Sequence, residues 1–360
     1  MKNSSTSSSD LAHSAGDDAF QPAGSRWITS LVLALVCTMV ALIAYEASLR
    51  ASGAQPNFRD NQARWSSVRD KADRDTATDS IALLGASRIR AAISLNTLEA
   101  RYPGQSVYSL AYAGRNPCAV LIDLAETTEF RGVVLMSMNS NWVDCRPGPF
   151  QMHRTVARYH QEWNWARKID SWVSERVTQN LLFTDEHYSI RHLIATVLKT
   201  GHPLPETPHT ITRKNRQIEF DFSRFNEDEL ALVRSRSRHA FNSRAELGGS
   251  KNPDLWEAGL VKLSEAIETI TARGGRVVLL RLPTSDPLKL AEETHFPREQ
   301  YWEELSVRLR ATAILHYADY PALTQYDIPD GNHLDYRDAP DFTADILEAI
   351  EEAGLELKRR

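Results

Sequence analysis

The 360-residue chain lacks an excess of charge of either sign. It has 42 Lys and Arg against 47 Asp and Glu, which gives a formal net charge of -5 and a pI near 6.1. That balance offers no reason to expect a nucleic-acid partner. Local basic clusters at 213–216 and 234–244 are typical of solvated faces. The 25% charged and 42% hydrophobic content is ordinary for a globular protein and excludes disorder over most of the chain.

Metal ligands and cysteines are also scarce. His187 and His192 have no further ligands at useful spacing, so neither a metal site nor a cofactor is predicted. Cys37 lies in a long apolar run, which leaves only Cys118 and Cys145 for the rest of the chain. No internal repeat is visible, and low complexity is confined to the N-terminal tail.

One long apolar run follows that tail. Residues 1–26 are rich in Ser, Asp and Gly and predict a disordered tail. Residues 27–48 begin with a charge-free run that is close to the roughly 20 apolar residues needed to cross a bilayer, and Trp27 and Tyr45 stand at its ends. They predict a transmembrane anchor. A cleaved signal peptide is the alternative, but the run is too long for one. Residues 49–79 are polar and predict a stalk.

Residues 80–355 alternate between strand and helix patterns. Such alternation predicts an α/β domain with a doubly wound sheet, and near-continuous apolar runs favour parallel strands. The predicted strands are 81–85, 106–111, 133–138, 277–282 and 313–317. The predicted helices are 95–102, 117–130, 255–273, 298–310 and 341–353. Residues 146–252 interrupt the pattern, and we interpret them as a mostly helical insertion that caps the active edge of the sheet.

Three tryptophans lie in this insertion. Trp165 and Trp172 share one face of a predicted helix, and Trp163 precedes it. Such residues either stack on carbohydrate or pack in a core, and core packing is the favoured prediction.

Polar residues follow the first three predicted strands, where open α/β sheets bind their ligands. Ser87 follows the first strand after a glycine, Gly114 follows the second, and Asn139 and Asn141 follow the third. Taken singly, each has an ordinary interpretation as a helix cap, a turn glycine or a loop residue.

Asp330 and His333 lie three residues apart before the last predicted helix. This spacing places a carboxylate beside an imidazole and would fix the tautomer of that imidazole, as in a hydrolase triad. A surface turn followed by a helix start is the alternative.

Taken together, these residues resemble the SGNH (GDSL-like) hydrolase superfamily in its membrane-anchored bacterial type. The resemblance covers 79–130, 133–142 and 255–353, and it implies a flavodoxin-like doubly wound parallel sheet. It assigns Ser87 as nucleophile, His333 as base and Asp330 as its acid partner. The oxyanion hole would consist of the backbone N–H groups of Ser87 and Gly114 and the side chain of Asn141.

Two blocks depart from the superfamily pattern. The first reads Gly-Ala-Ser-Arg instead of Gly-Asp-Ser-Leu. The third reads Asn-Ser-Asn-Trp instead of Gly-x-Asn-Asp, so Asn139 competes with Asn141 as the oxyanion donor. Neither change removes a residue that makes or breaks bonds.

The resemblance implies an ester hydrolase that forms an acyl-enzyme through Ser87 and acts on an ester or an acylated carbohydrate. An O-acyltransferase of extracellular polysaccharide would use the same triad, and a catalytically inactive binding scaffold is the alternative from another class. Arg88, Arg115 and Arg281 flank strand ends. They are candidates for binding an anionic substrate, with structural salt bridges as the alternative.

The implied fold also bears on the cysteines and the compartment. Cys118 lies four residues after Gly114, and Cys145 lies four residues after Asn141. In the implied fold these two loops are neighbours, so a Cys118–Cys145 disulfide is a candidate, with two free thiols as the alternative. A disulfide requires an oxidising compartment. The positive-inside rule favours the opposite orientation, because only Arg26 precedes the apolar run whereas Arg50 and Arg59 follow it. We expect a single-pass protein of the inner or plasma membrane with an extracytoplasmic catalytic domain, and this conflict stands.

Overall fold

The computed structural model describes residues 26–201, 208–247 and 252–355, so the predicted disordered tail lies almost wholly outside the described residues. Helix α1 (Arg26–Ala51) forms a unit of its own with the residues before Gly53. Its segment Trp27–Ala51 has a mean hydropathy of 2.4 and no buried residue in its most apolar part. By length and composition this helix is a candidate membrane span, and it extends three residues beyond the predicted anchor.

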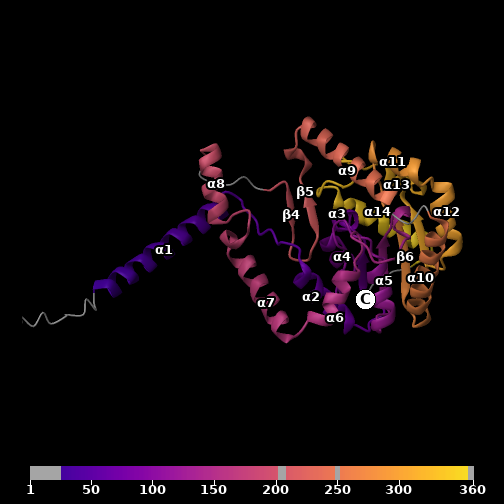
Figure 1. Cartoon of the computed structure of the whole chain (residues 1–360), viewed down its shortest axis with the longest axis horizontal. Helices are drawn as coiled ribbons and strands as arrows, with labels where there is room; N and C mark the ends of the chain where they lie inside the picture. Colours follow the sequence, from indigo (N-terminus) through magenta and orange to yellow (C-terminus); the bar gives the residue numbers. More distant parts are fainter. Residues whose placement is uncertain (1–25, 202–207, 248–251, 356–360) are drawn as a thin grey trace, which may run out of the picture. The chain divides into compact units, whose positions relative to one another are not determined.

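Five parallel strands form the central sheet of the second unit, Gly53–Arg360. They are β1 (Ile81–Leu84), β2 (Val107–Ser109), β3 (Val133–Ser137), β6 (Arg276–Arg281) and β7 (Ala313–His316). Their order is β2-β1-β3-β6-β7, with β1 paired to both β2 and β3. Figure 1 shows β6 of this sheet among helices of the same unit. Numbered along the chain this order is 2-1-3-4-5, one of the two common orders of doubly wound sheets. The predicted α/β class and parallel sheet are confirmed.

Alternate residues of each strand face opposite sides of the sheet, so two hydrophobic cores form. On β1, for example, Ala82 and Leu84 belong to one core and Ile81 and Leu83 to the other. The first core is covered by α5 (Cys118–Thr127), α10 (Pro253–Ala272) and α12 (Arg298–Arg308). The second is covered by α3 (Ser87–Ala92), α4 (Leu95–Arg101) and α14 (Ala339–Glu352). Helices therefore cover both faces of the sheet and leave its carboxyl edge for the loops that follow the strands.

The predicted stalk is wrong for its second half. Helix α2 (Gln62–Asp73) packs into the first core, where Trp65 is fully buried and its Nε1 donates to the Leu110 carbonyl at 2.8 Å. Arg69 is equally buried and its Nε donates to Asp123 at 2.6 Å. Part of the segment's charge is therefore paired inside the fold, while Lys71 and Asp73 are exposed.

The insertion is mostly helical, as predicted, but it also contains a hairpin. Its helices are α6 (His153–Glu162), α7 (Trp165–Asn180), α8 (Ile190–Thr200) and α9 (Glu227–Leu247). Strands β4 (Thr210–Thr212) and β5 (Ile218–Phe220) pair antiparallel between α8 and α9. Core packing is wrong for two of the three tryptophans. Trp163 packs against the first core, whereas Trp165 is 74% exposed and Trp172 is 60% exposed.

Candidate active site

Ser87 stands at a turn that only glycine permits. Strand β1 ends at Leu84, and Gly85 then adopts φ +141°. A Cβ at Gly85 would lie 3.0 Å from both Ile89 Cγ2 and Ser137 Cβ. Glycine therefore lets the chain reverse tightly against β3, and Ser87 becomes the first residue of α3 at the carboxyl edge of the sheet.

Ser87, His333 and Asp330 form one continuous hydrogen-bonded chain. The Ser87 Oγ lies 2.7 Å from His333 Nε2, and His333 Nδ1 lies 2.7 Å from Asp330 Oδ2. The serine is 246 residues from the histidine in sequence. An ionised Asp330 accepts a hydrogen bond from Nδ1–H, which leaves Nε2 as the acceptor for the serine hydroxyl. This is the geometry needed to activate a nucleophile.

Asp330 is held as a carboxylate by its surroundings. Its side chain is nearly fully buried, and burial alone would raise its pKa. The charge and hydrogen bond of His333 oppose this, together with the backbone N–H groups of Asn332 and His333, which donate to Oδ1 at 2.8 and 2.7 Å. The net effect lowers the pKa of Asp330 below its ordinary value. Asp330 therefore stays charged when the imidazole takes up a proton.

The insertion contributes directly to this site through Phe220 on β5. Its ring stacks on the imidazole of His333, with centroids 4.3 Å apart and an interplanar angle of 18°. The Tyr336 N–H donates to the Phe220 carbonyl at 3.0 Å, and the Phe222 N–H donates to Asp335 at 2.9 Å. The hairpin is thus fixed to the loop that carries His333 and fills one face of the ring.

A cavity of about 210 Å³ lies beside Ser87. Residues that follow β1, β2 and β3 line it from below, and α9 lines it from above. They include Ser87, Gly114, Asn139, Asn141, Ser237, Phe241 and Arg244. The structure therefore gathers the predicted oxyanion residues around one cavity, and α9 covers the active edge as the cap predicted from sequence.

Asn139 and Asn141 both line this cavity, but their surroundings differ. The Oδ1 of Asn139 accepts from Arg88 Nη1 at 2.8 Å and from Arg281 Nη1 at 3.3 Å. Because its oxygen is held by two guanidinium groups, the amide NH₂ of Asn139 is its remaining donor group. Asn141 lies on the short helix η1 (Ser140–Trp142) and is half-buried. The choice of oxyanion donor between them stays open.

Arg88 and Arg281 are both paired with a buried acid that the sequence did not reveal. Glu292, on α11 (Leu288–His295), accepts from Arg88 Nη2 at 2.7 Å and also from Arg281. Burial would raise the pKa of Glu292, but the two arginines outweigh it and lower that pKa. Arg88 Nε also donates to Asn332 at 2.5 Å, so Arg88 ties α11 to the loop of His333. Arg88 and Arg281 thus form the structural salt bridges that were the alternative to substrate binding. Substrate binding by either arginine stays a prediction.

Arg244, which the sequence did not single out, is the cavity's other cationic side chain. It is half-buried, its guanidinium lies 4.6 Å from the centre of the Phe150 ring, and no acidic partner is found for it among the described residues. Its Nη2 would lie 3.7 Å from a Cβ on Gly114, which has φ +68°. Burial and the nearby charge of Arg115 lower the pKa of Arg244. Arg115 itself donates to the Pro149 carbonyl.

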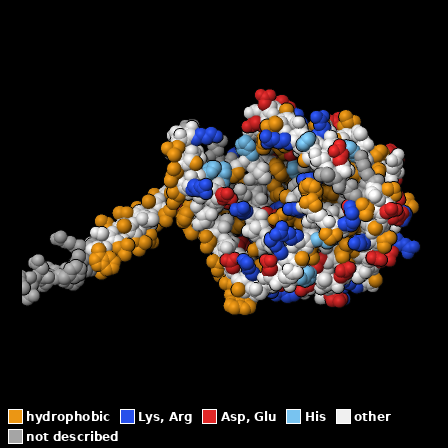
Figure 2. All heavy atoms as spheres, viewed as in Figure 1, with side chains coloured by type: hydrophobic (Ala, Val, Ile, Leu, Met, Phe, Trp, Pro, Cys, Tyr) orange, Lys and Arg blue, Asp and Glu red, His pale blue; other side chains and the backbone are white. Residues whose placement is uncertain are grey.

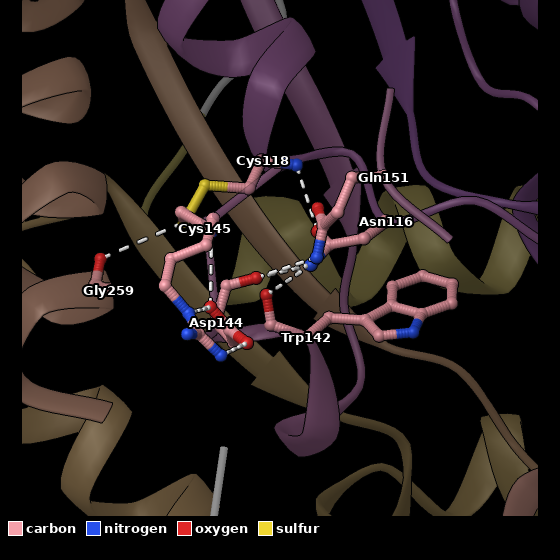
Figure 3. The surroundings of a disulfide bond; sticks show 8 residues. Asn116, Cys118, Trp142, Asp144, Cys145, Gln151 and Gly259 are labelled. Atoms are coloured by element: carbon pink, nitrogen blue, oxygen red, sulfur yellow. Dashed lines mark hydrogen bonds and ion pairs between the residues drawn. A yellow bond between two sulfur atoms is a disulfide. The ribbon is translucent and has the colours of Figure 1, made fainter. Parts of the chain in front are cut away.

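A disulfide and an asparagine join the two loops that carry Gly114 and Asn141 (Figure 3). Cys118 and Cys145 are bonded, with their Cα atoms 5.6 Å apart. Beside them, the Asn116 Nδ2 donates to the carbonyls of Trp142 and Asp144 at 2.8 and 3.1 Å. The disulfide candidate is therefore present in the structure. Asn116 has no sequence signal of its own, because its role depends on two loops that meet only in the fold.

The structure joins Ser87, His333 and Asp330 by hydrogen bonds and places Gly114 in the lining of the cavity beside Ser87. Glu292, Phe220 and Asn116 had no signal in the sequence, and Arg244 belongs to the 234–244 cluster that was predicted to be a solvated face. Comparison with models of protein families and with curated proteins finds no match for this chain.

Proposed function

We propose that this chain is a membrane-anchored, serine-dependent ester hydrolase of the SGNH type. The observation that carries the proposal is the hydrogen-bonded series Ser87–His333–Asp330, with both bonds at 2.7 Å, at the carboxyl edge of a parallel sheet. The strand order and the cavity that brings Gly114, Asn139 and Asn141 beside Ser87 support it further.

The reaction follows from the protons these residues hold. His333 Nε2 takes the proton of Ser87 while Oγ attacks the ester carbonyl, and Asp330 stabilises the resulting imidazolium. The oxyanion receives hydrogen bonds from the backbone N–H groups of Ser87 and Gly114 and from the amide of Asn141 or Asn139. His333 then returns the proton to the leaving alcohol, and water attacks the acyl-enzyme with His333 again as base.

Arg244 narrows the substrate class. Partial burial of a guanidinium without an acidic partner costs free energy, and a negatively charged ligand would offset that cost. We therefore propose an ester that carries an anionic group, and an acylated acidic carbohydrate fits both this feature and the resemblance. The candidate membrane span and the Cys118–Cys145 disulfide support an extracytoplasmic location for the domain.

The test uses the full chain in detergent with 4-nitrophenyl acetate as substrate. We expect Ser87→Ala to lower turnover by a factor of about 10³ or more, because among the described residues no other nucleophile is bonded to His333. Ser237→Ala removes a serine of the same cavity and should keep activity. Equal turnover by the Ser87→Ala variant and the unaltered chain would leave only the inactive-scaffold alternative.

Two extensions refine the assignment. Asn139→Ala and Asn141→Ala, measured side by side, identify the oxyanion donor as the variant with the larger loss of kcat. Oligosaccharide acceptors added to the assay, with products weighed by mass spectrometry, separate hydrolysis from acyl transfer, because only a transferase yields an acylated oligosaccharide.

A further inference from the structure

Helices α7 and α8 present an apolar surface that no described residue of the second unit covers. Most of the large exposed apolar side chains in the described part of Gly53–Arg360 lie on these two helices and the turn between them. We define the α7–α8 surface by its most exposed members, Trp165, Ile169 and Trp172 on α7 and Ile190, Ile194 and Leu198 on α8. Leu198 is 82% exposed. In Figure 2 hydrophobic side chains run along the outer side of α7.

The residues of this surface are spaced for a helix face. Positions 165, 169 and 172 on α7 and 190, 194 and 198 on α8 recur at intervals of three and four, which places each set on one side of its helix. Ser171, on the opposite side of α7 from Ile169, is buried, so that side is attached to the body, and two ion pairs hold one flank of the helix. Lys168 pairs with Asp70 of α2 at 2.7 Å, and Glu175 pairs with Lys214 of the hairpin turn at 3.5 Å. The apolar side therefore faces away from the fold.

Within the second unit, residues that soon follow the candidate membrane span in the chain contact the α7–α8 region. Asn57 and Arg59 line one cavity with Thr178 and Glu186 from the α7–α8 region, and Arg59 pairs with Glu186 at 3.2 Å. Helix α1 ends at Ala51, only six residues before Asn57. Six extended residues span at most about 20 Å, so the connection between α1 and Asn57 is short.

We propose that the α7–α8 surface rests in the headgroup region of the same bilayer that α1 crosses. An amphipathic helix with tryptophan on its apolar side and basic residues on its flanks is suited to that depth. Arg176, which lies over the Trp172 ring at 5.7 Å, is such a flanking residue. Two attachments, one span and one surface, fix the height and tilt of the catalytic edge above the membrane. This proposal is independent of the chemistry at Ser87.

The test places a fluorescent label on the full chain in phosphatidylcholine vesicles that contain spin-labelled phosphatidylcholine. Cys37→Ser leaves no other free thiol among the described residues, and Leu198→Cys then carries the label. Val307→Cys on α12 is the matched control, because Val307 is also 82% exposed. We expect several-fold stronger quenching at position 198 than at position 307.

Further outcomes decide what covers the surface. Adding Trp172→Glu and Ile194→Glu should relieve the quenching at position 198, because charge is costly at that depth. Equal quenching at 198 and 307, or quenching that survives both substitutions, would overturn the proposal. A blue-shifted label that lipid does not quench, and whose shift grows with protein density, would assign the surface to a second copy of the chain instead.

Discussion

At the scale of single residues, the candidate site contains side chains that several hydrogen bonds hold in place and at least one, Arg244, for which no acidic partner is found among the described residues. Ser87 and Asp330 are both bonded to His333, and Arg88 is bonded on three sides by Asn139, Asn332 and Glu292. These residues have little freedom left to respond to a ligand. If the proposed function is correct, we expect substrate specificity to depend most on a cavity side chain that has more freedom to move than these.

Arg244 is the residue that should set this specificity. We expect Arg244→Gln to lower kcat/KM about tenfold or more for an ester with a carboxylate, since a hydrogen bond to a charged group contributes about 1.5–3 kcal/mol. For a neutral ester the change should stay within about twofold, as for a rim charge that the ligand does not meet. Steady-state kinetics with 4-nitrophenyl hemisuccinate, 4-acetoxybenzoate and phenyl acetate make the comparison.

Arg236→Gln is the control for this prediction, because Arg236 is exposed on the same helix and does not line the cavity beside Ser87. A parallel loss for charged and neutral esters would assign Arg244 a structural role. An unchanged Arg244→Gln variant would remove the anionic group from the proposed substrate.

At the scale of elements, the strand ends were predictable because each is a local pattern. Each apolar run is followed by a short motif: Gly-x-Ser, Gly114 or Asn139-Ser-Asn. The rule that parallel strands end at one edge of the sheet is enough to predict that these motifs lie together. The closing elements were not predictable in this way. Phe220 reaches His333 from a short hairpin, and Glu292 reaches Arg88 from a helix with no strong pattern.

Helix α7 shows what a periodic sequence pattern can and cannot predict. The spacing of Trp165 and Trp172 correctly indicates one helical face, but a periodic pattern does not say what covers that face. Likewise the polar sequence of α2 hides a buried helix, because its charged residues find partners such as Asp123 only in the folded chain.

The disulfide gives an element-scale prediction. Replacing Cys118 and Cys145 together by serine should lower the free energy of unfolding by about 2–4 kcal/mol, because the crosslink restricts the unfolded chain. It should also lower kcat, since the loops of Gly114 and Asn141 would then be joined mainly by Asn116. Guanidinium unfolding in detergent and turnover of 4-nitrophenyl acetate measure the two effects.

Cys37→Ser should change neither quantity, because Cys37 is a free, exposed residue of α1. If the double variant keeps full stability and full turnover, the crosslink has no part in organising the oxyanion loops, and Asn116 becomes sufficient to join them.

At the scale of the whole molecule, buried titratable groups determine how the fold responds to acid. The pKa values of Asp330 and Glu292 are lowered, so the stability they contribute is present above about pH 4 and is lost only as the pH falls further. His316, at the end of β7, affects the free energy of unfolding at a higher pH than these two acids do. Burial and the charges of Arg281 and Arg298 lower its pKa from 6.5 to about 3.

For His316 the unfolded chain binds a proton at a pH where the folded chain does not. The stability it contributes is therefore complete above about pH 6.5 and is lost as the pH falls from there towards 3. Its Nδ1 accepts the Ala318 N–H at 3.2 Å, which requires the neutral ring. We expect the free energy of unfolding to decline below pH 6.5 by up to about 1.4 kcal/mol per pH unit for this one proton.

His316→Gln should flatten that decline between pH 6.5 and 4.5, because glutamine offers an acceptor oxygen but no proton to bind in this range. Burial also lowers the pKa of His153, so a smaller slope of the same sign should remain. Guanidinium unfolding of the full chain in detergent, followed by tryptophan fluorescence at a series of pH values, measures both slopes. A variant that keeps the original slope would show that the acid sensitivity arises elsewhere, and that the cations around β7 do not keep His316 neutral in the folded protein.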